Sequence, residues 1–257
     1  MLTLEQIKEF VGIEIFQRSH KAALVEYLQY EILDSLYKQK NSEKLSFIGG
    51  TSIRIVYGSQ RFSEDLDFDN FGLKFNDFKE LLNHVVKDME LKGFNLEFRF
   101  VEKMAFHCYI KFPKILSQNN ITTDTEEKLL IRIDTVEKDK IVKSDISILN
   151  NFNVYRKILV NPSSIILSQK IITILERKRE KGRDFYDVSY LLGKTEPDYE
   201  YIEKSRGIDR EMLKKKLLER IDEVNLKELA EDVIPFLINP NDVNRVLTFK
   251  EYIEQKL

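Results

Sequence analysis

The stretch FIGGTSIRIVYGSQRFSEDLDFD, residues 47–69, constrains the fold of this chain more than any other. A short apolar run, Leu45–Ile48, leads into it and predicts a buried strand. The glycine pair that follows ends the strand, because glycine adopts backbone angles closed to other residues and lets a ligand approach the main chain. The next residues predict a helical turn, and free N–H groups at such a turn can bind phosphate. The phosphate-binding candidates are Gly49, Gly50, Thr51, Ser52 and, after the helix, Ser63.

Three carboxylates follow on a second predicted strand, at Asp65, Asp67 and Asp69. Strand side chains alternate between faces, so the carboxylates share one face while Leu66 and Phe68 point into the core. Like charges stacked this closely repel, and burying them unpaired is costly. A divalent cation would resolve the repulsion, and hard oxygen ligands suit magnesium. Either piece alone would be an ordinary turn or a solvated edge strand, but together they favour phosphoryl or nucleotidyl transfer.

The order Gly-Gly-Thr-Ser, a short gap, then Arg-Phe-Ser-Glu-Asp-Leu-Asp-Phe resembles the nucleotidyltransferase family of AbiEii-type toxins, within the polymerase-beta-like superfamily. The resemblance implies that Asp65 and Asp67 hold Mg²⁺ (or Mn²⁺) bridging the phosphates of a nucleoside triphosphate. It also implies a third acidic strand, for which the segment Lys128–Val136 is the candidate. By resemblance Asp134 in that strand would be a metal ligand or a base, and the alternative is a surface aspartate at a strand end.

A second group of candidates lies between Lys170 and Asp187. A helix predicted over 165–179 places Lys170 at the edge of its apolar stripe, and the segment Arg177–Arg183 then holds five basic residues in seven positions. By resemblance Lys170 would hold the triphosphate as a point charge, and Asp184 would orient that lysine or act as an acid. The family signature Lys-x-Arg-Asp-x-Tyr-Asp is matched by Lys181, Arg183, Asp184, Tyr186 and Asp187.

The basic segment itself has two interpretations. It is either a solvated helix end with Arg183 and Asp187 paired four residues apart, or a cluster that holds the backbone of a nucleic-acid acceptor. The chain as a whole has a net charge of −2, so a globally basic coat is absent and only a local basic patch could serve this purpose.

Composition limits the remaining possibilities. The single cysteine, Cys108, excludes an intramolecular disulfide framework and fits a reducing compartment. The first residues are charged too early for a signal peptide, and no apolar run reaches membrane-spanning length. We therefore expect a cytoplasmic protein without a membrane segment. His107 and Cys108 have no partner nearby in sequence and are interpreted as packing residues.

The periodicity of the chain predicts an α/β protein of two lobes. A mixed-sheet nucleotidyltransferase-like lobe would cover residues 1–150, with the boundary in the weakly patterned segment 141–160, and a helical lobe would cover 151–257. The predicted helices of the first lobe are 4–12, 21–39 and 76–91, the last capped by Asn76, and its further strands are 95–101 and 104–112. In the second lobe, helices are predicted near 197–204, 210–221, 226–237 and 242–257.

These observations and the resemblance lead to one functional hypothesis. The chain is predicted to be a magnesium-dependent nucleotidyltransferase that moves a nucleoside monophosphate from a nucleoside triphosphate to an acceptor. The resemblance implies the toxin half of a toxin–antitoxin pair, with a cognate antitoxin as partner and RNA, such as a tRNA 3′ end, as acceptor. The alternatives are a small-molecule nucleotidyltransferase with the same site, or a non-catalytic module that binds a nucleotide or a partner.

Overall fold

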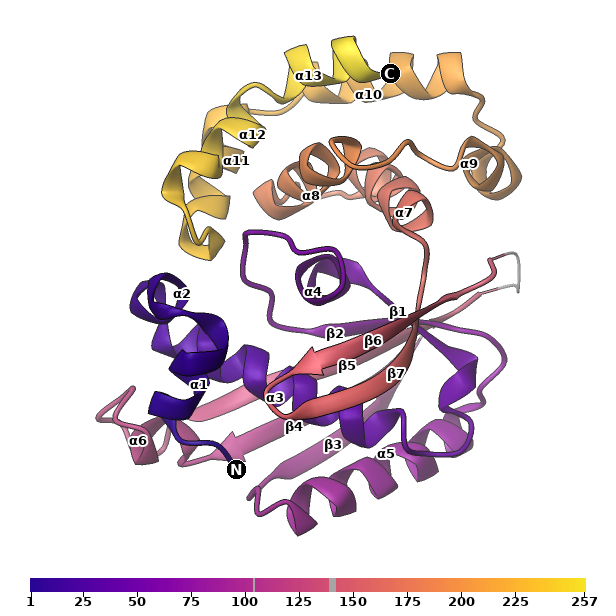
Figure 1. Cartoon of the computed structure of the whole chain (residues 1–257). Helices are drawn as coiled ribbons and strands as arrows, with labels where there is room; N and C mark the ends of the chain where they lie inside the picture. The colour runs from indigo at the N-terminus through magenta and orange to yellow at the C-terminus, as the bar shows by residue number, and fades with distance from the viewer. Residues whose placement is uncertain (104, 139–141) are drawn as a thin grey trace. The chain divides into compact units, whose positions relative to one another are not determined.

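The computed structural model describes residues 1–103, 105–138 and 142–257, and these divide into two compact units. The first, which we call the sheet unit, comprises Met1–Val56 and Phe62–Val160. The second, the helical unit, comprises Tyr57–Arg61 and Asn161–Leu257. Figure 1 shows the sheet and its helices in indigo to rose, and residues 161–257 of the helical unit in salmon to yellow. The predicted α/β class with a mixed sheet is confirmed.

A seven-stranded mixed sheet, within the described residues, forms the frame of the sheet unit, in the order β3-β4-β5-β2-β1-β7-β6. The predicted aspartates lie on or next to the neighbouring strands β2 and β5 near the centre of the sheet. Strand β2 runs parallel to β5 and antiparallel to β1. The strands are β1 Leu45–Ile48, β2 Leu66–Asn70, β3 Glu97–Glu102, β4 Phe106–Pro113, β5 Lys128–Glu137, β6 Asp145–Asn151 and β7 Val154–Val160.

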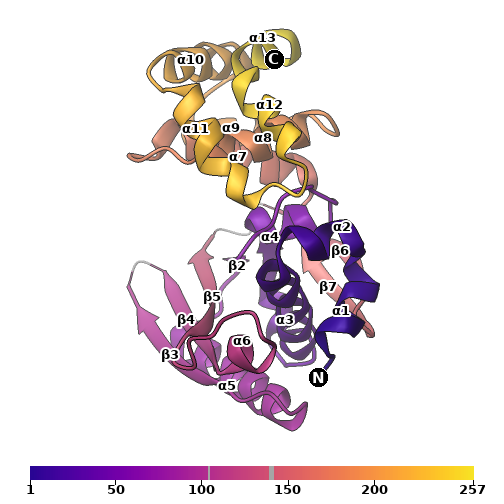
Figure 2. The ribbon, with the colours of Figure 1, turned by 90° about the vertical axis from the view of Figure 1, so that its left-hand side faces the viewer.

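Two long helices, α3 and α5, pack against each other and against β7 and β4, and so cover one face of the sheet (Figure 2). Alternation along β5 places Ile131 and Ile133 in the core, while Arg132 and Asp134 on the opposite face stay partly exposed. The helices are α1 Leu4–Val11, α2 Ile13–Arg18, α3 His20–Leu36, α4 Gly49–Ile55, α5 Phe75–Leu91 and α6 Ile115–Gln118.

The sequence does not predict the β6–β7 hairpin, because the apolar residues of segment 141–160 show no clear period. Its exposed edge strand explains the error: Ile146 and Ile148 point outward, so the apolar residues do not mark the buried face. The chain reverses at Phe152 and Asn153, both with positive φ (51° and 62°), close to the turn that the asparagines indicate. Ile141, the predicted start of that segment, lies outside the described residues, as does Met104, the predicted start of β4.

Other boundaries moved by short distances. Helix α5 begins at Phe75 after Lys74, so the predicted cap at Asn76 is wrong, and no side chain caps this helix. Helix α7 ends at Glu176 instead of residue 179, which leaves the basic segment as a connection between two helices. The last predicted helix is interrupted: a 3-10 turn, Pro240–Val243, leads into α12, and Thr248 separates α12 from α13.

The helical unit is built on α7 and α8, which pack on each other, with α11, α12 and α13 against α8 and α10 against α7 and α13. Asp198, Asp209 and Asn225 accept hydrogen bonds from the first-turn N–H groups of α9, α10 and α11 and so set where these helices begin. The helices are α7 Ser163–Glu176, α8 Gly182–Leu192, α9 Tyr199–Arg206, α10 Arg210–Asp222, α11 Leu226–Val233, α12 Asn244–Leu247 and α13 Phe249–Lys256.

The short segment Tyr57–Arg61 belongs to the helical unit although it lies between two parts of the sheet unit in the chain. Its main chain is held at three places: Arg61 forms an isolated bridge with Leu237, the Gln60 carbonyl accepts from Ile238, and the Tyr57 carbonyl accepts from the Tyr190 hydroxyl at 2.9 Å. No helix in the described part of the chain is both long and apolar enough to cross a bilayer.

Candidate functional site

The glycine turn abuts the carboxylate strand. Gly49 opens α4 with φ of +76°, and a Cβ built there would lie 2.3 Å from Oδ2 of Asp67. Only glycine fits this conformation and this contact. The Thr51 hydroxyl donates to the Asp65 carbonyl and lies 2.9 Å from the Ser63 hydroxyl. The turn therefore fixes the start of the carboxylate strand by main-chain and side-chain contacts.

The hydroxyl groups of the turn are largely used inside the protein. Thr51 and Ser52 are fully buried, and the Ser52 hydroxyl donates to the Gly49 carbonyl at 2.9 Å. Gly50 is also buried, whereas Gly49 and Ser63 are half-buried. Of the predicted phosphate-binding residues, Ser63 thus has the side chain nearest to solvent, and the others can offer only their main chain.

The predicted carboxylates Asp65, Asp67 and Asp134 gather on one face of the sheet. Asp67 and Asp134 are paired in register on the neighbouring parallel strands β2 and β5, so their side chains project side by side. Asp65 lies one residue before β2. Asp69, predicted to share the face, is buried at 1% exposure and stands apart from the accessible cluster.

Arg132 lies among the three carboxylates. Its Nη2 is 2.8 Å from Oδ2 of Asp65, and its Nε is 2.7 Å from Oδ2 of Asp134. Partial burial alone would lower the pKa of Arg132, but the attraction of Asp65, Asp134 and Asp67, in that order, outweighs it and raises the pKa. Three carboxylates and one guanidinium leave two negative charges on this face.

The pKa of Asp65 is raised from its ordinary value. Burial is the largest cause, and repulsion from Asp134 and Glu64 adds to it, while Arg132 acts in the opposite direction. A carboxyl group that is hard to ionise beside other carboxylates is typical of a site that gains from an added cation. The electrostatics and the register therefore agree that this cluster carries unbalanced negative charge.

His107 is a member of this cluster that the sequence analysis missed. It is on β4, paired in register with Asp134 on β5, and its Nδ1 is 2.7 Å from Oδ1 of Asp134. The expectation that His107 is only a packing residue is wrong, because its side chain stays partly exposed and contacts the third carboxylate. For Cys108 the expectation is confirmed: burial raises the pKa of its thiol to about 12.

The donor chemistry of the cluster fits a hard divalent cation. Carboxylate oxygens are the ligands that Mg²⁺ and Mn²⁺ prefer, and two uncompensated negative charges match one such ion. Among the described residues, however, no three His, Cys, Asp or Glu side chains already converge on one point as metal ligands would. One guanidinium already links Asp65 with Asp134, so a metal ion held there has to compete with Arg132.

A second charged cluster lies inside the helical unit. Arg61 donates to both carboxylate oxygens of Asp187 at 2.6 Å, and these side chains are 2% and 0% exposed. Lys170 Nζ is 2.9 Å from Oδ2 of Asp187 and 2.9 Å from Oδ1 of Asp184. Arg177 Nη1 completes the group, 3.3 Å from Oδ2 of Asp184. We call these five side chains the buried ion network.

Three members of the buried ion network, Arg61, Lys170 and Asp187, are stabilised in their charged forms. Burial alone would raise the pKa of Asp187, but Arg61 and Lys170 outweigh it and lower the pKa. Burial would likewise lower the pKa of Lys170, and the attraction of Asp184 and Asp187 raises it instead. Three cations and two carboxylates sum to one positive charge, so the network can accept an anion without losing its internal pairs.

Several partners in these clusters differ from the expectations. The expected contact between Lys170 and Asp184 is present. The solvated-helix interpretation paired Asp187 with Arg183, but the ion pairs of Asp187 are with Arg61 and Lys170. Arg183 instead lies over the Phe236 ring at 4.3 Å. The sequence analysis assigned no role to Arg61 or Arg132. Arg61 stands inside the quoted motif, which is the signal that could have indicated its importance.

A mixed sheet with carboxylates on neighbouring strands, entered through a Gly-Gly-Thr-Ser turn, defines a nucleotidyltransferase-type protein. The family model "Nucleotidyl transferase AbiEii toxin, Type IV TA system" matches residues 31–247. The chain therefore belongs to the AbiEii nucleotidyltransferase toxin family, and it is a nucleotidyltransferase of the toxin–antitoxin type.

Solved structures support the fold independently. The crystal structure of JHP933 from Helicobacter pylori matches 93% of this chain and 94% of that chain with a TM-score of 0.56. A second structure, described as "putative nucleotidyltransferase from H. pylori", matches 92% of this chain and 95% of that chain with a TM-score of 0.59. Each is 19% identical to this chain, so these likenesses show the fold alone. Among curated proteins, no sequence matches this chain.

Proposed function

We propose that this protein is a toxin that transfers a nucleoside monophosphate from a nucleoside triphosphate to an RNA acceptor, such as a tRNA 3′ end, with Mg²⁺ or Mn²⁺ as cofactor. The observation that carries the proposal is the gathering of Asp65, Asp67 and Asp134 around one guanidinium with two negative charges left over. The family assignment supplies the reaction class, and the cluster supplies the chemistry that such a reaction needs.

In this proposal, Asp65, Asp67 and Asp134 hold the metal ion. The bound ion would supply charge neutralisation on the phosphates and the developing charge of the leaving pyrophosphate. Asp134 also lies against His107, which fixes its orientation and leaves its other oxygen toward Arg132. The main chain at Gly49, Gly50, Thr51 and Ser52, with the Ser63 hydroxyl, would contact the phosphates.

Lys170 and Asp184 are the proposed contribution of the helical unit. Lys170 would bind a phosphate oxygen with the net positive charge of the buried ion network, and Asp184 would keep its ammonium group oriented. In the overall reaction, an acceptor hydroxyl oxygen attacks the α-phosphorus, the bond from that phosphorus to the bridging oxygen breaks, and pyrophosphate leaves. The hydroxyl proton passes to a base, for which Asp134 is the candidate.

The proposal is tested by incubating the protein with each α-labelled nucleoside triphosphate, Mg²⁺ and total RNA. We expect labelled RNA with one nucleotide preferred, and no label when the metal is chelated or when Asp67 is replaced by asparagine. Label that appears without RNA on a small molecule would favour the alternative, a small-molecule nucleotidyltransferase. The family assignment speaks against the other alternative, a non-catalytic binding module. A cognate antitoxin is proposed as a functional partner, and the lone buried cysteine fits a cytoplasmic setting.

A further inference from the structure

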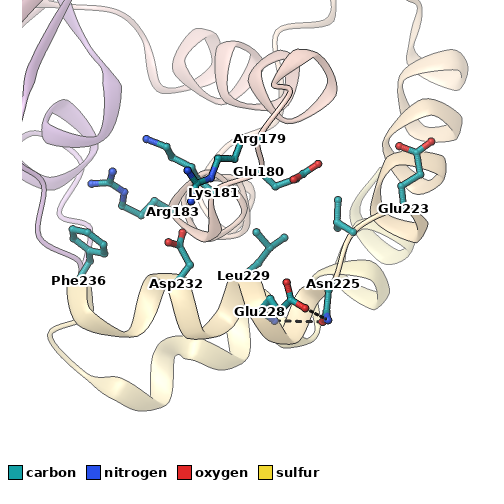
Figure 3. Close-up of a pocket in the computed structure, with 11 residues that line it drawn as sticks. Arg179, Glu180, Lys181, Arg183, Glu223, Asn225, Glu228, Leu229, Asp232 and Phe236 are labelled. Atoms are coloured by element: carbon teal, nitrogen blue, oxygen red, sulfur yellow. Dashed lines mark hydrogen bonds between the residues drawn. The ribbon is translucent and has the colours of Figure 1, made fainter.

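A hollow of about 710 Å³ lies inside the helical unit, between the connection from α7 to α8 and the helix α11 (Figure 3). Arg179, Lys181 and Arg183 line one wall. The facing wall comes from α11 and the 3-10 turn Ile234–Phe236 that follows it. The hollow is large enough for a nucleotide-sized group, since ligand sites commonly measure about 300–1,000 Å³.

The two walls of the hollow are joined through Gly182, which lies between the lining residues Lys181 and Arg183. A Cβ built on Gly182 would lie 1.8 Å from the Leu229 carbonyl oxygen, so the start of α8 touches the main chain of α11 directly. The Gly182 N–H donates to Oδ2 of Asp232 at 2.8 Å across the same contact. Because both walls are joined at this point, the side chains above it are carried on a rigid base.

The acidic side chains of the hollow already have partners. Glu180 and Glu223 both pair with Arg220, the latter at 2.9 Å. Glu228 accepts from the Asn225 amide at 2.8 Å, as the dashed line in Figure 3 shows, and Asp232 accepts from Gly182. These carboxylates are therefore not available as the main attraction for a cationic ligand.

Two cations of the hollow, unlike its acids, have no partner among the described residues. In the part of the chain that the structure describes, neither Arg179 nor Lys181 makes an ion pair or a side-chain hydrogen bond, and both are exposed. At the same end, the Arg183 guanidinium lies 4.3 Å from the centre of the Phe236 ring (Figure 3). The hollow thus combines a planar cation–aromatic pair with two cations that make no ion pair to any residue the structure describes.

A nucleotide of a single strand matches this combination better than an acidic peptide does. A phosphodiester brings one negative charge to Arg179 and Lys181, and the uncharged base that accompanies it can stack on the planar pair. A peptide with several carboxylates would leave the planar pair unused and would bring more negative charge than Arg179 and Lys181 can balance beside the acids of the same hollow. The segment that carries the two cations also leads directly into Asp184, the proposed acid of the helical unit.

We infer that this hollow holds a phosphate and an unstacked base of the single-stranded end of an RNA acceptor, an inference that rests on the proposed RNA-modifying function. Arg179 and Lys181 contact the phosphate, and Arg183 with Phe236 supplies the stacking surface. Arg177 does not belong to this site, because its guanidinium is 3.3 Å from Asp184 in the buried ion network.

The experiment measures binding of a fluorescein-labelled 12-nucleotide single-stranded RNA to the full chain by anisotropy, without nucleoside triphosphate, across a series of salt concentrations. The Arg179→Gln/Lys181→Gln variant should bind about tenfold more weakly and lower the salt slope by about 0.7, since the one phosphate contact that it loses on a single strand contributes about that much. Phe236→Leu should weaken binding about fivefold with an unchanged salt slope, because it removes stacking and no charge.

The matched control is Lys215→Gln/Lys216→Gln on α10, which removes two exposed cations from the same unit and should keep the parent affinity and slope. If the Arg179/Lys181 variant matches the parent, or the control loses as much, the hollow is not the RNA site, although RNA remains the acceptor. If the parent itself binds no RNA at low salt, both this inference and the proposed RNA acceptor fail. Equal competition by a poly-glutamate peptide would also overturn the inference, because it would show a general anion site.

Discussion

The two charged clusters of this protein are opposite in sign and in accessibility. The carboxylate cluster of the sheet unit keeps two negative charges after Arg132 is counted, and Asp65 and Arg132 remain 38% and 39% exposed. In the buried ion network of the helical unit, every charged side chain has an oppositely charged partner, and Arg61 and Asp187 are almost fully inaccessible. Its three cations and two carboxylates leave one positive charge. The first cluster is open to solvent and has unbalanced negative charge, which is why we propose it as the cation site, and the second is inaccessible and internally paired.

Because the clusters differ in accessibility and in charge pairing, we expect them to respond differently to substitution. Removing a carboxylate from the accessible cluster takes away a ligand but relieves repulsion, so activity should fall without loss of stability. Removing one partner from the buried network breaks charge-assisted hydrogen bonds that no water can replace, so stability should fall first. The predictions below set these two responses against each other.

The largest effect is expected for Asp67→Asn. The variant should lose on the order of 10³-fold or more in kcat/KM, because one of the proposed metal ligands and one of the two unbalanced charges are gone. Transfer rates and a urea unfolding curve measure activity and stability on the same preparation. Glu64→Gln, an acid-to-amide change at the exposed residue before Asp65, is the control and should stay near the parent. Full activity in a well-folded Asp65→Asn/Asp67→Asn variant would refute the site.

Breaking the buried pair should have the largest effect on stability. Arg61→Met should lower the free energy of unfolding by roughly 3–5 kcal/mol, because the inaccessible Asp187 loses both hydrogen bonds from the guanidinium and keeps only Lys170 as a partner. Arg61→Met/Asp187→Leu should recover most of this loss, since an apolar pair of similar volume needs no compensation. Urea unfolding of the single and double variants decides the matter. A single variant within about 1 kcal/mol of the parent would show that the pair is not structurally important.

Lys170 tests whether the buried network also has a functional face. Lys170→Met should weaken nucleoside triphosphate binding by about 10- to 100-fold, the range expected for a lost charge-assisted hydrogen bond. Asp184→Ala should lower turnover more than affinity, because it orients the lysine. Calorimetry with Mg²⁺ present measures the affinity, and Lys170→Arg, which keeps the charge, is the control. Unchanged affinity in a folded Lys170→Met variant would restrict the network to a structural role.

Arg132 offers a smaller effect of opposite sign. Arg132→Gln should raise the affinity for Mn²⁺ by roughly tenfold, because the guanidinium that occupies Asp65 and Asp134 no longer competes with the ion. Titration of Mn²⁺ followed by electron paramagnetic resonance gives the affinity without any dependence on turnover. Lys128→Gln, on the same strand but paired with Glu97, is the matched control. Weaker Mn²⁺ binding in Arg132→Gln would show that Arg132 supports the ion instead.

The smallest effect concerns Asp34, a structural carboxylate of the sheet unit. Burial would raise its pKa, but hydrogen bonds from Lys38, Lys92 and Arg156 outweigh this and lower the pKa from 3.8 to about 2. The folded state therefore binds the proton less tightly than the unfolded state, so the stabilisation is present above about pH 4 and is lost as the pH falls toward 2. Asp34→Asn should cost about 1–2 kcal/mol at pH 7 and flatten the acid limb of the stability curve. Loss of transfer activity in this variant at neutral pH would contradict its purely structural role.

Local patterns predicted the elements that repeat with a clear period. Helices α5 and α10 and strand β5 lie close to their expected positions, because their apolar residues mark the buried side. The same short-range reasoning, together with the family motif, predicted that Asp67 and Asp134 lie on one face and that Lys170 contacts Asp184.

Long-range partners could not be predicted in this way. Arg61 and Asp187 are 126 residues apart, and nothing local indicates that one guanidinium serves the other. His107 reaches Asp134 only because β4 pairs with β5 in one particular register. The outward-facing isoleucines of β6 hid its strand character, because a pattern of apolar residues carries information only where those residues are buried.

The segment Tyr57–Arg61 has a consequence for how the protein is made. A ribosome that adds roughly 5–20 residues per second needs on the order of ten seconds to proceed from Arg61 to Asp187, 126 residues later. Throughout that interval the guanidinium has been synthesised but its carboxylate has not. The helical unit therefore assembles last, and its own C-terminal stretch, translated without residues 57–61, would bury Asp187 with Lys170 but without its bidentate partner Arg61. A gene cut between these segments separates the two halves of one ion pair, so neither fragment encodes a complete helical unit.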